Sequence, residues 1–342
     1  MNILFHTNQI SERGTEIALY DYAIGNQTVL NNTSFVASPK DRIFDQNILD
    51  KFKESFFVFL YQSKDELYNF IENNNINLIY KIENGKEIDS LLHENIPHFI
   101  HCVFTIQYKH GNFYCPISPF LNYWYKKSYP VLPHIVKKFP GNIETLRKTL
   151  NIPDNAIVFG GYGGMTSFNI SFVQKEIINV ANKYKNIYFL FMNFNSFIND
   201  NSLNNIIFVQ KNTDINYKEI FINTCDAMIH AQSLGETFGL AVAEFSIKNK
   251  PVITFSYNLI SNPILSIKTL LKYLLNRGFD YGTAHLDFLG KKAIRYSNKY
   301  KLRDIFINFK NKYYKNNINY DCYSEIFNET KVMKIFENII SK

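Results

Sequence analysis

Residues 226–255 read DAMIHAQSLGETFGLAVAEFSIKNKPVITF, and this pattern predicts a strand, a loop, a helix and a second strand. The two strands are short apolar runs, Ala227–His230 and Pro251–Phe255. Between them, Phe238–Ile247 carries apolar residues at the spacing of a helix. Gly235 gives the connecting loop its backbone freedom. The stretch is therefore typical of an α/β unit with parallel strands.

The loop before this helix is suited to bind phosphate. A helix that begins at the carboxyl end of a parallel strand presents unpaired backbone N–H groups and the positive end of its dipole. Thr237 is placed to cap the helix. Glu236 and Glu244 frame it, and eight residues of helix rise about 12 Å, comparable with the distance from sugar to ribose across a diphosphate. Taken alone, the two glutamates are more simply explained as a first-turn acid and a solvated helix residue.

The segment Glu236–Leu240 (ETFGL), followed by Glu244, resembles the E-x7-E motif of family-4 retaining glycosyltransferases, which have the GT-B fold. The resemblance extends in pattern over Gly160–Phe255. It implies that Glu236 lies beside a donor sugar and that Glu244 binds the ribose hydroxyls of the donor. It also implies that the backbone amides between them meet the sugar and the diphosphate.

The composition indicates a folded protein that can handle anionic molecules. Of the 342 residues, 46% are hydrophobic and 16% aromatic, which excludes a disordered chain and suffices for two domains. The net charge of +7 is compatible with nucleotide sugars or lipid head groups. Four scattered cysteines without metal-ligand spacing predict reduced thiols, and hence a cytoplasmic protein. No apolar run approaches the roughly 20 residues of a membrane span, and the first residues are interpreted as a strand and a loop, not a signal peptide.

The chain opens with the pattern of a Rossmann-like domain. Asn2–His6 is a predicted strand, and the loop Asn8–Gly14 leads to a predicted helix over Thr15–Ala23. The absence of G-x-G-x-x-G excludes a dinucleotide site. In GT-B enzymes the equivalent loop faces the cleft, so Arg13, Gly14 and Thr15 are candidates to contact donor phosphate or acceptor. A solvated turn explains Arg13 equally well.

Alternating strands and helices continue through the first half and predict a mostly parallel sheet. The further predicted strands are Ser55–Leu60, Asn77–Tyr80, Pro97–Phe104 and Cys115–Pro119, and the predicted helices are Asp65–Glu72, Ile88–His93 and Phe120–Tyr125. His101 ends one of these strands, where GT-B enzymes often place a histidine near the donor sugar. A histidine of the core is the equal alternative. Tyr129–Val136 is proline-punctuated and is interpreted as the interdomain linker.

The second half repeats the alternation. The predicted strands are Asn155–Gly160, Ile187–Met192 and Ile206–Val209, and the predicted helices are Glu144–Leu150, Phe172–Tyr184, Tyr217–Asn223, Ile264–Leu275 and Tyr323–Ile340. The first strand ends in the glycine-rich run GGYGG (160–164), which suits close approach to a diphosphate. Family members usually carry an Arg and a Lys there, whereas the nearest cation here is Lys175. Lys291–Lys315 mixes basic and aromatic residues, which indicates nucleic acid, an anionic membrane or, by preference, a solvated helix face.

We therefore expect an α/β protein with the GT-B fold, in which two Rossmann-like domains face each other across a cleft. Residues 1–135 would form the acceptor-side domain and 136–322 the nucleotide-sugar donor side, with a final helix over 323–342 that packs back on the first domain. The catalytic candidates are Glu236, His101 and Arg13. The donor-binding candidates are Gly14, Thr15, Gly161, Gly163, Gly164, Lys175, His230, Gly235, Thr237, Phe238, Gly239, Leu240 and Glu244.

The expected activity is transfer of a sugar from a nucleotide-sugar donor to an acceptor hydroxyl, with retention of configuration. No D-x-D motif occurs, so neither a metal nor another cofactor is expected. A glycan, a lipid-linked molecule or a protein is the expected acceptor. Nucleic acid is not an expected partner, and peripheral membrane contact is compatible with the sequence. The alternatives are a GT-B nucleotide-sugar epimerase and, given the missing cations, a non-catalytic nucleotide-sugar-binding protein.

Overall fold

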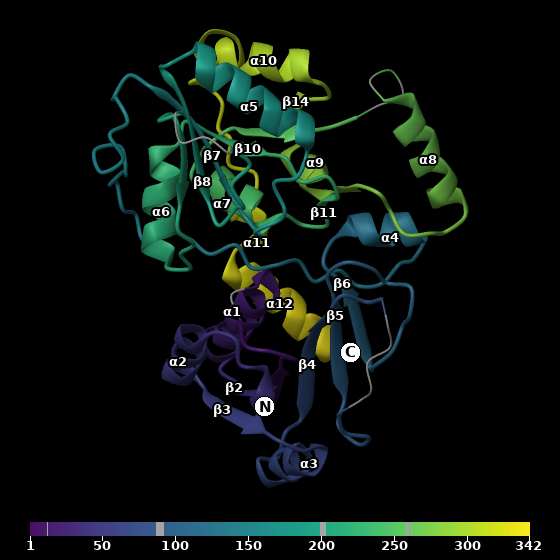
Figure 1. Ribbon diagram of the computed structural model, residues 1–342. Coiled ribbons are helices and arrows are strands. Elements are labelled where there is room, and N and C mark those ends of the chain that lie inside the picture. Colours follow the sequence, from purple (N-terminus) through teal and green to yellow (C-terminus); the bar gives the residue numbers. More distant parts are fainter. Residues whose placement is uncertain (12, 87–91, 199–202, 258–259, 261) are drawn as a thin grey trace. The chain divides into compact units, whose positions relative to one another are not determined.

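The computed structural model describes residues 1–11, 13–86, 92–198, 203–257, 260 and 262–342 (Figure 1). The chain forms two compact units. The first consists of Met1–Val136 together with Ile326–Lys342, and the second of Lys137–Glu325. Each unit is built on its own six-stranded sheet, as the alternation of predicted strands and helices indicated.

The first sheet has the strand order β3-β2-β1-β4-β5-β6, and its described strand pairs are all parallel. Its strands are β1 (Asn2–His6), β2 (Thr33–Pro39), β3 (Phe57–Tyr61), β4 (Leu78–Glu83), β5 (His98–Cys102) and β6 (Phe113–Pro116). The helices of this unit are α1 (Gly14–Thr28), η1 (Lys40–Arg42), α2 (Gln46–Ser55), α3 (Lys64–Asn73), α4 (Pro119–Tyr125) and α12 (Glu329–Ile340). The strand order reverses between β1 and β4, as in a Rossmann-like unit. Most of the expected helix over Ile88–His93 lies outside the described residues.

The sequence pattern does not predict β2 or α2. The strand β2 (TSFVASP) shows only a weak alternation of apolar and polar residues. The structure shows which of its residues belong to the core, because Val36 and Ala37 are buried between β1 and β3. The helix α2 begins where the Asp45 carboxylate accepts a hydrogen bond from the Ile48 amide at 3.1 Å. Both elements therefore depend on contacts that a short periodicity does not contain.

The last helix of the chain packs within the first unit. The α12 side chain Phe336 lies with its ring centre 5.0 Å from that of Phe99 in β5. Gly25 of α1 permits close approach of the same helix, because a Cβ atom there would lie 2.7 Å from Met333 Cγ.

The sequence predicts one helix over Tyr323–Ile340, but the structure has two. They are α11 (Ser324–Phe327) and α12. Asn328 is extended between them, and its side chain accepts a hydrogen bond from the Lys331 amide at 3.0 Å. A capping residue thus starts a new helix where periodicity alone predicts continuation.

The second sheet has the order β14-β12-β10-β7-β8-β9, with parallel pairs throughout its described part. Its strands are β7 (Ile157–Tyr162), β8 (Ile187–Met192), β9 (Ile206–Val209), β10 (Ala227–His230), β12 (Val252–Phe255) and β14 (Ile294–Tyr296), and a separate pair is formed by β11 (Gly235–Glu236) and β13 (Gly282–Thr283). The helices are α5 (Ser171–Lys183), α6 (Ile215–Thr224), α7 (Leu240–Ile247), α8 (Pro263–Leu274), α9 (Ala284–Leu289), η2 (Gly290–Lys292), α10 (Lys299–Ile307) and η3 (Phe309–Tyr313), and α11 begins in this unit and ends in the first. As in the first sheet, the first strand in chain order lies beside the fourth, so β7 and β10 meet at the switch point.

The expected helix over Glu144–Leu150 is wrong, because this segment forms turns. The Leu146 amide donates to Thr224 Oγ1 at 2.7 Å, and Arg147 donates to the Ala156 carbonyl at 3.1 Å and to the Asp226 carboxylate at 3.0 Å. These contacts with distant residues hold the segment in a non-helical path.

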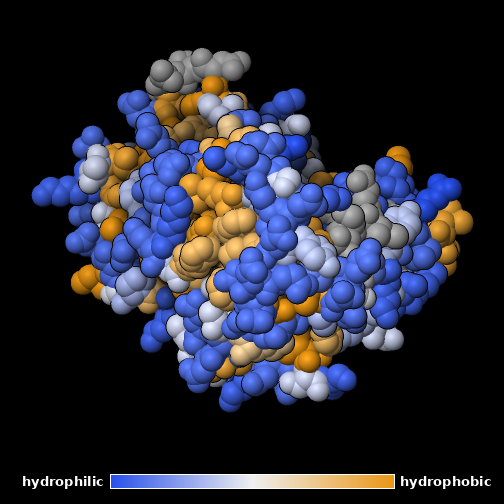
Figure 2. Space-filling model, turned by 90° about the horizontal axis from the view of Figure 1, so that it is seen from below, coloured by the Kyte–Doolittle hydropathy of each residue, from blue (hydrophilic) through white to orange (hydrophobic). Residues whose placement is uncertain are grey.

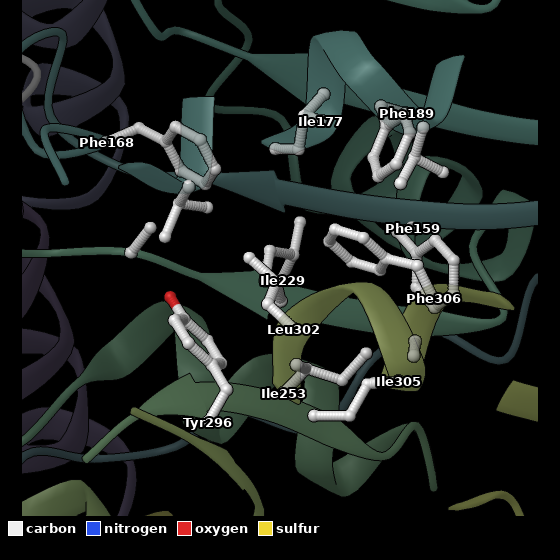
Figure 3. Packing of buried hydrophobic residues seen from close by; sticks show 14 of the residues in the cluster. Phe159, Phe168, Ile177, Phe189, Ile229, Ile253, Tyr296, Leu302, Ile305 and Phe306 are labelled. Carbon is white, nitrogen blue, oxygen red and sulfur yellow. The ribbon is translucent and has the colours of Figure 1, made fainter. Parts of the chain in front are cut away.

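The core of the second unit is rich in aromatic rings (Figure 3). Phe306 of α10 lies with its ring centre 4.9 Å from that of Phe159 in β7 and 5.0 Å from that of Phe189 in β8. On another side of the same helix, Arg303 pairs with Glu176 of α5 through contacts of 2.5 and 2.9 Å. Part of the basic and aromatic segment therefore covers the sheet with its apolar residues and turns its charged residues outward.

We expect Phe306→Ala to lower the free energy of unfolding of the second unit by about 3–5 kcal/mol, because it removes a buried ring and leaves a cavity. Tyr300→Ala is the control on the same helix, since Tyr300 is exposed, and it should change stability by less than about 0.5 kcal/mol. Urea unfolding followed by circular dichroism measures both. Equal stabilities of the two variants would show that α10 does not contribute to the core in this way.

Candidate active site

Glu236 is held in a two-residue strand, not in a helix. The strand β11 pairs with β13, where Gly235 lies opposite Gly282. Gly235 has a φ of +63°, and a Cβ atom there would lie 2.1 Å from the Gly282 carbonyl oxygen. Glycine is therefore required at this position. The expected helical spacing between Glu236 and Glu244 is wrong, because the chain between them is part strand and part helix.

The helix α7 begins at Leu240, after Gly239 with a φ of +88°. Thr237 is therefore not its N-cap, contrary to the sequence prediction, because the chain makes a left-handed turn two residues later. Gly239 has no side chain to cap the helix, and the first-turn amides are left to other partners. This N-terminus is suited to an anionic ligand by its amides and its dipole.

The Glu236 carboxylate stands at the end of a chain of hydrogen bonds from neighbouring elements. His230 Nε2 lies 3.1 Å from Glu236 Oε1, and His230 Nδ1 lies 2.9 Å from Thr254 Oγ1. Thr254 Oγ1 lies 3.0 Å from His285 Nε2. The two imidazole ring centres are 4.8 Å apart. We name this set, His230, Thr254 and His285, the histidine relay.

The hydrogen bonds of the histidine relay can all run in one direction, from His285 to Glu236. This requires an ionised carboxylate and two neutral imidazoles. A carboxylate can only accept, so His230 donates through Nε2–H and accepts at Nδ1 from the Thr254 hydroxyl. Thr254 in turn accepts from His285 Nε2–H. This leaves a lone pair on His285 Nδ1, which has no partner among the described residues. Burial and the neighbouring His230 lower the pKa of His285 well below its usual range, which keeps its ring neutral.

Glu244 is also restrained by two partners. Tyr162, at the end of β7, donates from its hydroxyl to Glu244 Oε2 at 2.5 Å. Lys218 Nζ of α6 lies 3.2 Å from Glu244 Oε1 and 5.6 Å from the centre of the Tyr162 ring. Burial and the Glu244 carboxylate raise the pKa of Tyr162 well above its usual range, so the hydroxyl stays a donor. The Glu244 side chain remains 20% exposed and the Glu236 side chain 28%, so both carboxylates can be reached.

The glycine-rich run divides into a packed part and an accessible part. Gly161 lies within β7, where a Cβ atom would be 2.8 Å from the Ile229 carbonyl oxygen, so it serves strand packing. Gly163 is half-buried and Gly164 is exposed in the loop that follows. Only this second part can approach a ligand.

Three residues that the sequence predicted to bind the donor have surroundings that do not match this role. Phe238 is buried, with its ring centre 5.4 Å from that of Phe288 and 5.9 Å from that of Tyr323, so it belongs to the core. Lys175 is exposed on α5. His230 does not face a ligand directly, because both ring nitrogens are engaged by Thr254 and Glu236.

His101 in the first unit has no exposed surface. Its Nε2–H donates to the Leu132 carbonyl at 2.7 Å, so Nδ1 accepts from the Tyr80 hydroxyl, also at 2.7 Å. The ring joins β4 and β5 to the extended segment 129–136 and cannot touch a sugar in this arrangement. Burial lowers the pKa of His101 to about 3.

The loop after β1 places Arg13, Gly14 and Thr15 at the start of α1. Arg13 and Gly14 are exposed, and nothing lies within 4 Å of a Cβ atom built on Gly14. The Thr15 hydroxyl donates to Glu16 at 2.9 Å, and burial raises the pKa of the Glu16 carboxyl. The three residues share one accessible surface of the first unit.

Sequence reasoning missed Lys218, Thr254 and His285, and it did not include Tyr162 among the site residues. Lys218 lies 26 residues before Glu244 on a different helix, and His285 lies 49 residues after Glu236. No short motif connects them to the glutamates. Only Tyr162, inside the glycine-rich run, had a local signal.

No protein-family profile and no curated protein sequence matches this chain. Solved structures do match. Anabaena Alr3699/HepE in complex with UDP-glucose aligns with a TM-score of 0.70 at 14% identity over 100% of both chains. The lipopolysaccharide outer core galactosyltransferase WaaB aligns with a TM-score of 0.60 at 12% identity, covering 100% of this chain and 99% of that one. A glycosyltransferase from Rickettsia africae aligns with a TM-score of 0.59 at 14% identity, also over 100% and 99%.

The chain is thus an α/β protein of two Rossmann-like units with parallel sheets. It has the GT-B fold of these glycosyltransferases. The fold predicted from the glutamate motif is confirmed.

We expect acid to destabilise the first unit through His101. Below a histidine's ordinary pKa of about 6.5 the unfolded chain binds a proton that folded His101 does not bind until about pH 3. The free energy of unfolding should therefore fall by about 1.4 kcal/mol per pH unit from this residue as the pH drops from about 6.5. Urea unfolding at pH 7 and pH 5, followed by the fluorescence of the single tryptophan, Trp124 in α4, reports on this unit. Between pH 7 and pH 5 the free energy of unfolding of His101→Gln should fall less than that of the unchanged protein, by the contribution of His101. An equal fall in both proteins would refute the low pKa assigned to His101.

Proposed function

We propose that this protein is a glycosyltransferase that moves a sugar from a nucleotide-sugar donor to an acceptor hydroxyl, with retention of configuration. One observation carries the proposal. Glu236 and Glu244 are both accessible, the first four residues before α7 and the second within it, and the N-cap position of α7 is held by a glycine. The E-x7-E resemblance and the GT-B fold support the same conclusion. HepE was solved with UDP-glucose, which supports a nucleotide sugar as the donor here.

We assign the donor-binding roles as follows. Glu244 accepts hydrogen bonds from the ribose hydroxyls, and the first-turn amides of α7, with Gly163 and Gly164, meet the diphosphate. Glu236 lies beside the donor sugar, where its negative charge stabilises positive charge that develops at the anomeric carbon. The bond between that carbon and the phosphate oxygen breaks, the acceptor oxygen takes its place, and the departing phosphate accepts the acceptor's proton.

Lys218 is our candidate for the missing cation in the second unit. It is held 3.2 Å from Glu244, whereas Lys175 is exposed on α5. Its ammonium group can turn from Glu244 to a phosphate oxygen when the ribose replaces it. Arg13, Gly14 and Thr15 remain candidates for contact with the donor phosphate or the acceptor from the first unit. We include no metal or other cofactor in this proposal, because the sequence has no D-x-D motif.

A glycan, a lipid-linked molecule or a protein is the proposed acceptor. The four cysteines are free, which suits a cytoplasmic protein. A panel of nucleotide sugars, with and without EDTA, tests the function. Acceptor-dependent release of nucleotide supports transfer, interconversion of the sugar indicates an epimerase, and binding without turnover indicates a non-catalytic protein. The last alternative is motivated by the replacement of the usual Arg and Lys by Tyr162 and its neighbours.

We expect Glu244→Ala to weaken UDP binding by about 10- to 100-fold, because it removes a charged acceptor worth about 1.5–3 kcal/mol. Lys218→Ala should weaken binding by roughly tenfold through loss of a charge-assisted contact. Lys175→Ala is the matched control and should bind UDP as the unchanged protein does. Titration calorimetry measures all three. An unchanged affinity in a folded Glu244→Ala protein would eliminate the ribose assignment.

Thr254→Val should separate catalysis from binding. It removes the hydroxyl that holds His230 in the tautomer that donates to Glu236, so kcat should fall by about tenfold or more with little change in donor affinity. Thr254→Ser keeps the hydroxyl and should retain most of the activity. Steady-state kinetics with the identified donor and circular dichroism of both variants test this. Equal losses in the two variants would mean that packing around Thr254, not its hydrogen bond, matters.

A further inference from the structure

The helix α8 (Pro263–Leu274) contributes nothing to the core of the second unit, since none of its residues is buried. In Figure 1 it stands away from the sheet of that unit, at the end of extended connections. Six aliphatic side chains on it or directly after it are between 51% and 81% exposed. They are Ile264, Ile267, Leu270, Leu271, Leu274 and Leu275. We name this set the α8 strip.

The exposed side of α8 is apolar, whereas that of an ordinary surface helix is polar. The α8 strip follows the spacing i, i+3, i+7 and i+10 with neighbours beside it, so it forms one continuous stripe. Two polar contacts help to attach the helix to the rest of the unit. Thr269 Oγ1 lies 2.9 Å from the Tyr257 hydroxyl, and Lys272 Nζ lies 2.5 Å from Asp280 Oδ1. The helix therefore turns a continuous apolar stripe to solvent, which marks an interaction surface.

The charge around the stripe favours an anionic partner. Residues 256–280 contain Lys268, Lys272 and Arg277 and a single acid, Asp280, whose Oδ1 lies 3.6 Å from Lys268 Nζ and 2.5 Å from Lys272 Nζ, so the segment keeps a net positive charge. Lys268 borders the stripe, and its side chain is 59% exposed. In a symmetric dimer through α8 the same basic residues would approach each other, which opposes a second copy as the occupant. An apolar stripe flanked by cations has the composition of a helix that lies in a membrane interface.

We propose that α8 docks this protein on the surface of an anionic lipid bilayer. The α8 strip enters the boundary between head groups and acyl chains, while Lys268 and Arg277 face the head groups. Figure 2 shows that apolar residues reach the surface among hydrophilic ones at several places on the face that it presents. Among the described residues no helix is long and apolar enough to cross a membrane. The proposal does not depend on the proposed glycosyl transfer, because lipid binding requires neither donor nor acceptor.

Co-sedimentation with vesicles of phosphatidylcholine and phosphatidylglycerol tests the proposal on the full chain. The unchanged protein should bind these vesicles, bind pure phosphatidylcholine vesicles less, and be partly released by added salt. Ile267→Glu with Leu271→Glu, in the middle of the α8 strip, should lower the partition coefficient by at least about tenfold. The matched control is Ile143→Glu, an exposed isoleucine elsewhere in the second unit, which should bind as the unchanged protein does apart from a small electrostatic loss.

Two further measurements distinguish this proposal from other occupants of the stripe. Analytical ultracentrifugation without vesicles should give a monomer. A dimer that the double variant converts to monomer would show that a second copy covers α8, and the proposal would be overturned. Absence of vesicle binding by the unchanged protein, or equal binding by the double variant, would overturn it as well. Lys268→Gln should weaken binding to the anionic vesicles only, and an equal loss on pure phosphatidylcholine would contradict the role given to charge.

Discussion

The second unit depends on a close approach between β7 and the segment 225–229, which leads into β10 and forms most of it. Only glycine in β7 allows this approach. A Cβ atom on Gly160 would lie 2.2 Å from Cys225 Sγ, and one on Gly161 would lie 2.8 Å from the Ile229 carbonyl oxygen. Because both side chains are absent, β7 pairs directly with β10 at the switch point of the sheet. Tyr162 and His230 then reach the same sheet edge, and each contacts one of the two glutamates.

The two glutamates are held by side chains from different elements, and this gives the site its order. Hydrogen bonds to charged groups contribute about 1.5–3 kcal/mol each, so a carboxylate with a fixed partner loses much of its freedom before any ligand binds. Tyr162 is a neutral donor to Glu244, and Lys218 adds positive charge from α6. A cation therefore lies within reach of Glu244 although the glycine-rich run itself has none.

The first unit uses the same strand order with different chemistry at its strand ends. There Glu83 of β4 pairs with Lys81 at 2.8 Å and with His110 at 2.9 Å, and all three side chains are almost fully buried. A buried ion pair of this kind contributes little net stability unless its other hydrogen bonds are satisfied. Strand order alone therefore does not define a ligand site. The second unit differs from the first in having accessible carboxylates at its strand ends.

Local patterns were sufficient to predict β1, β8, β9 and β10, the helix α5 and the glycine-bearing loop, because each has its own apolar period or its own turn residue. They also made Glu236 and Glu244 candidates for the site, since both belong to one short motif, and this remains a prediction. Periodicity missed β2 and predicted a helix over Glu144–Leu150, where contacts with distant residues decide the conformation. The roles of His101 and Phe238 were equally beyond it, because burial is a property of the assembled sheet. Tyr162, Lys218, Thr254 and His285 meet the glutamates only after the parallel strands align their carboxyl ends, and that alignment depends on pairings between residues far apart in the chain.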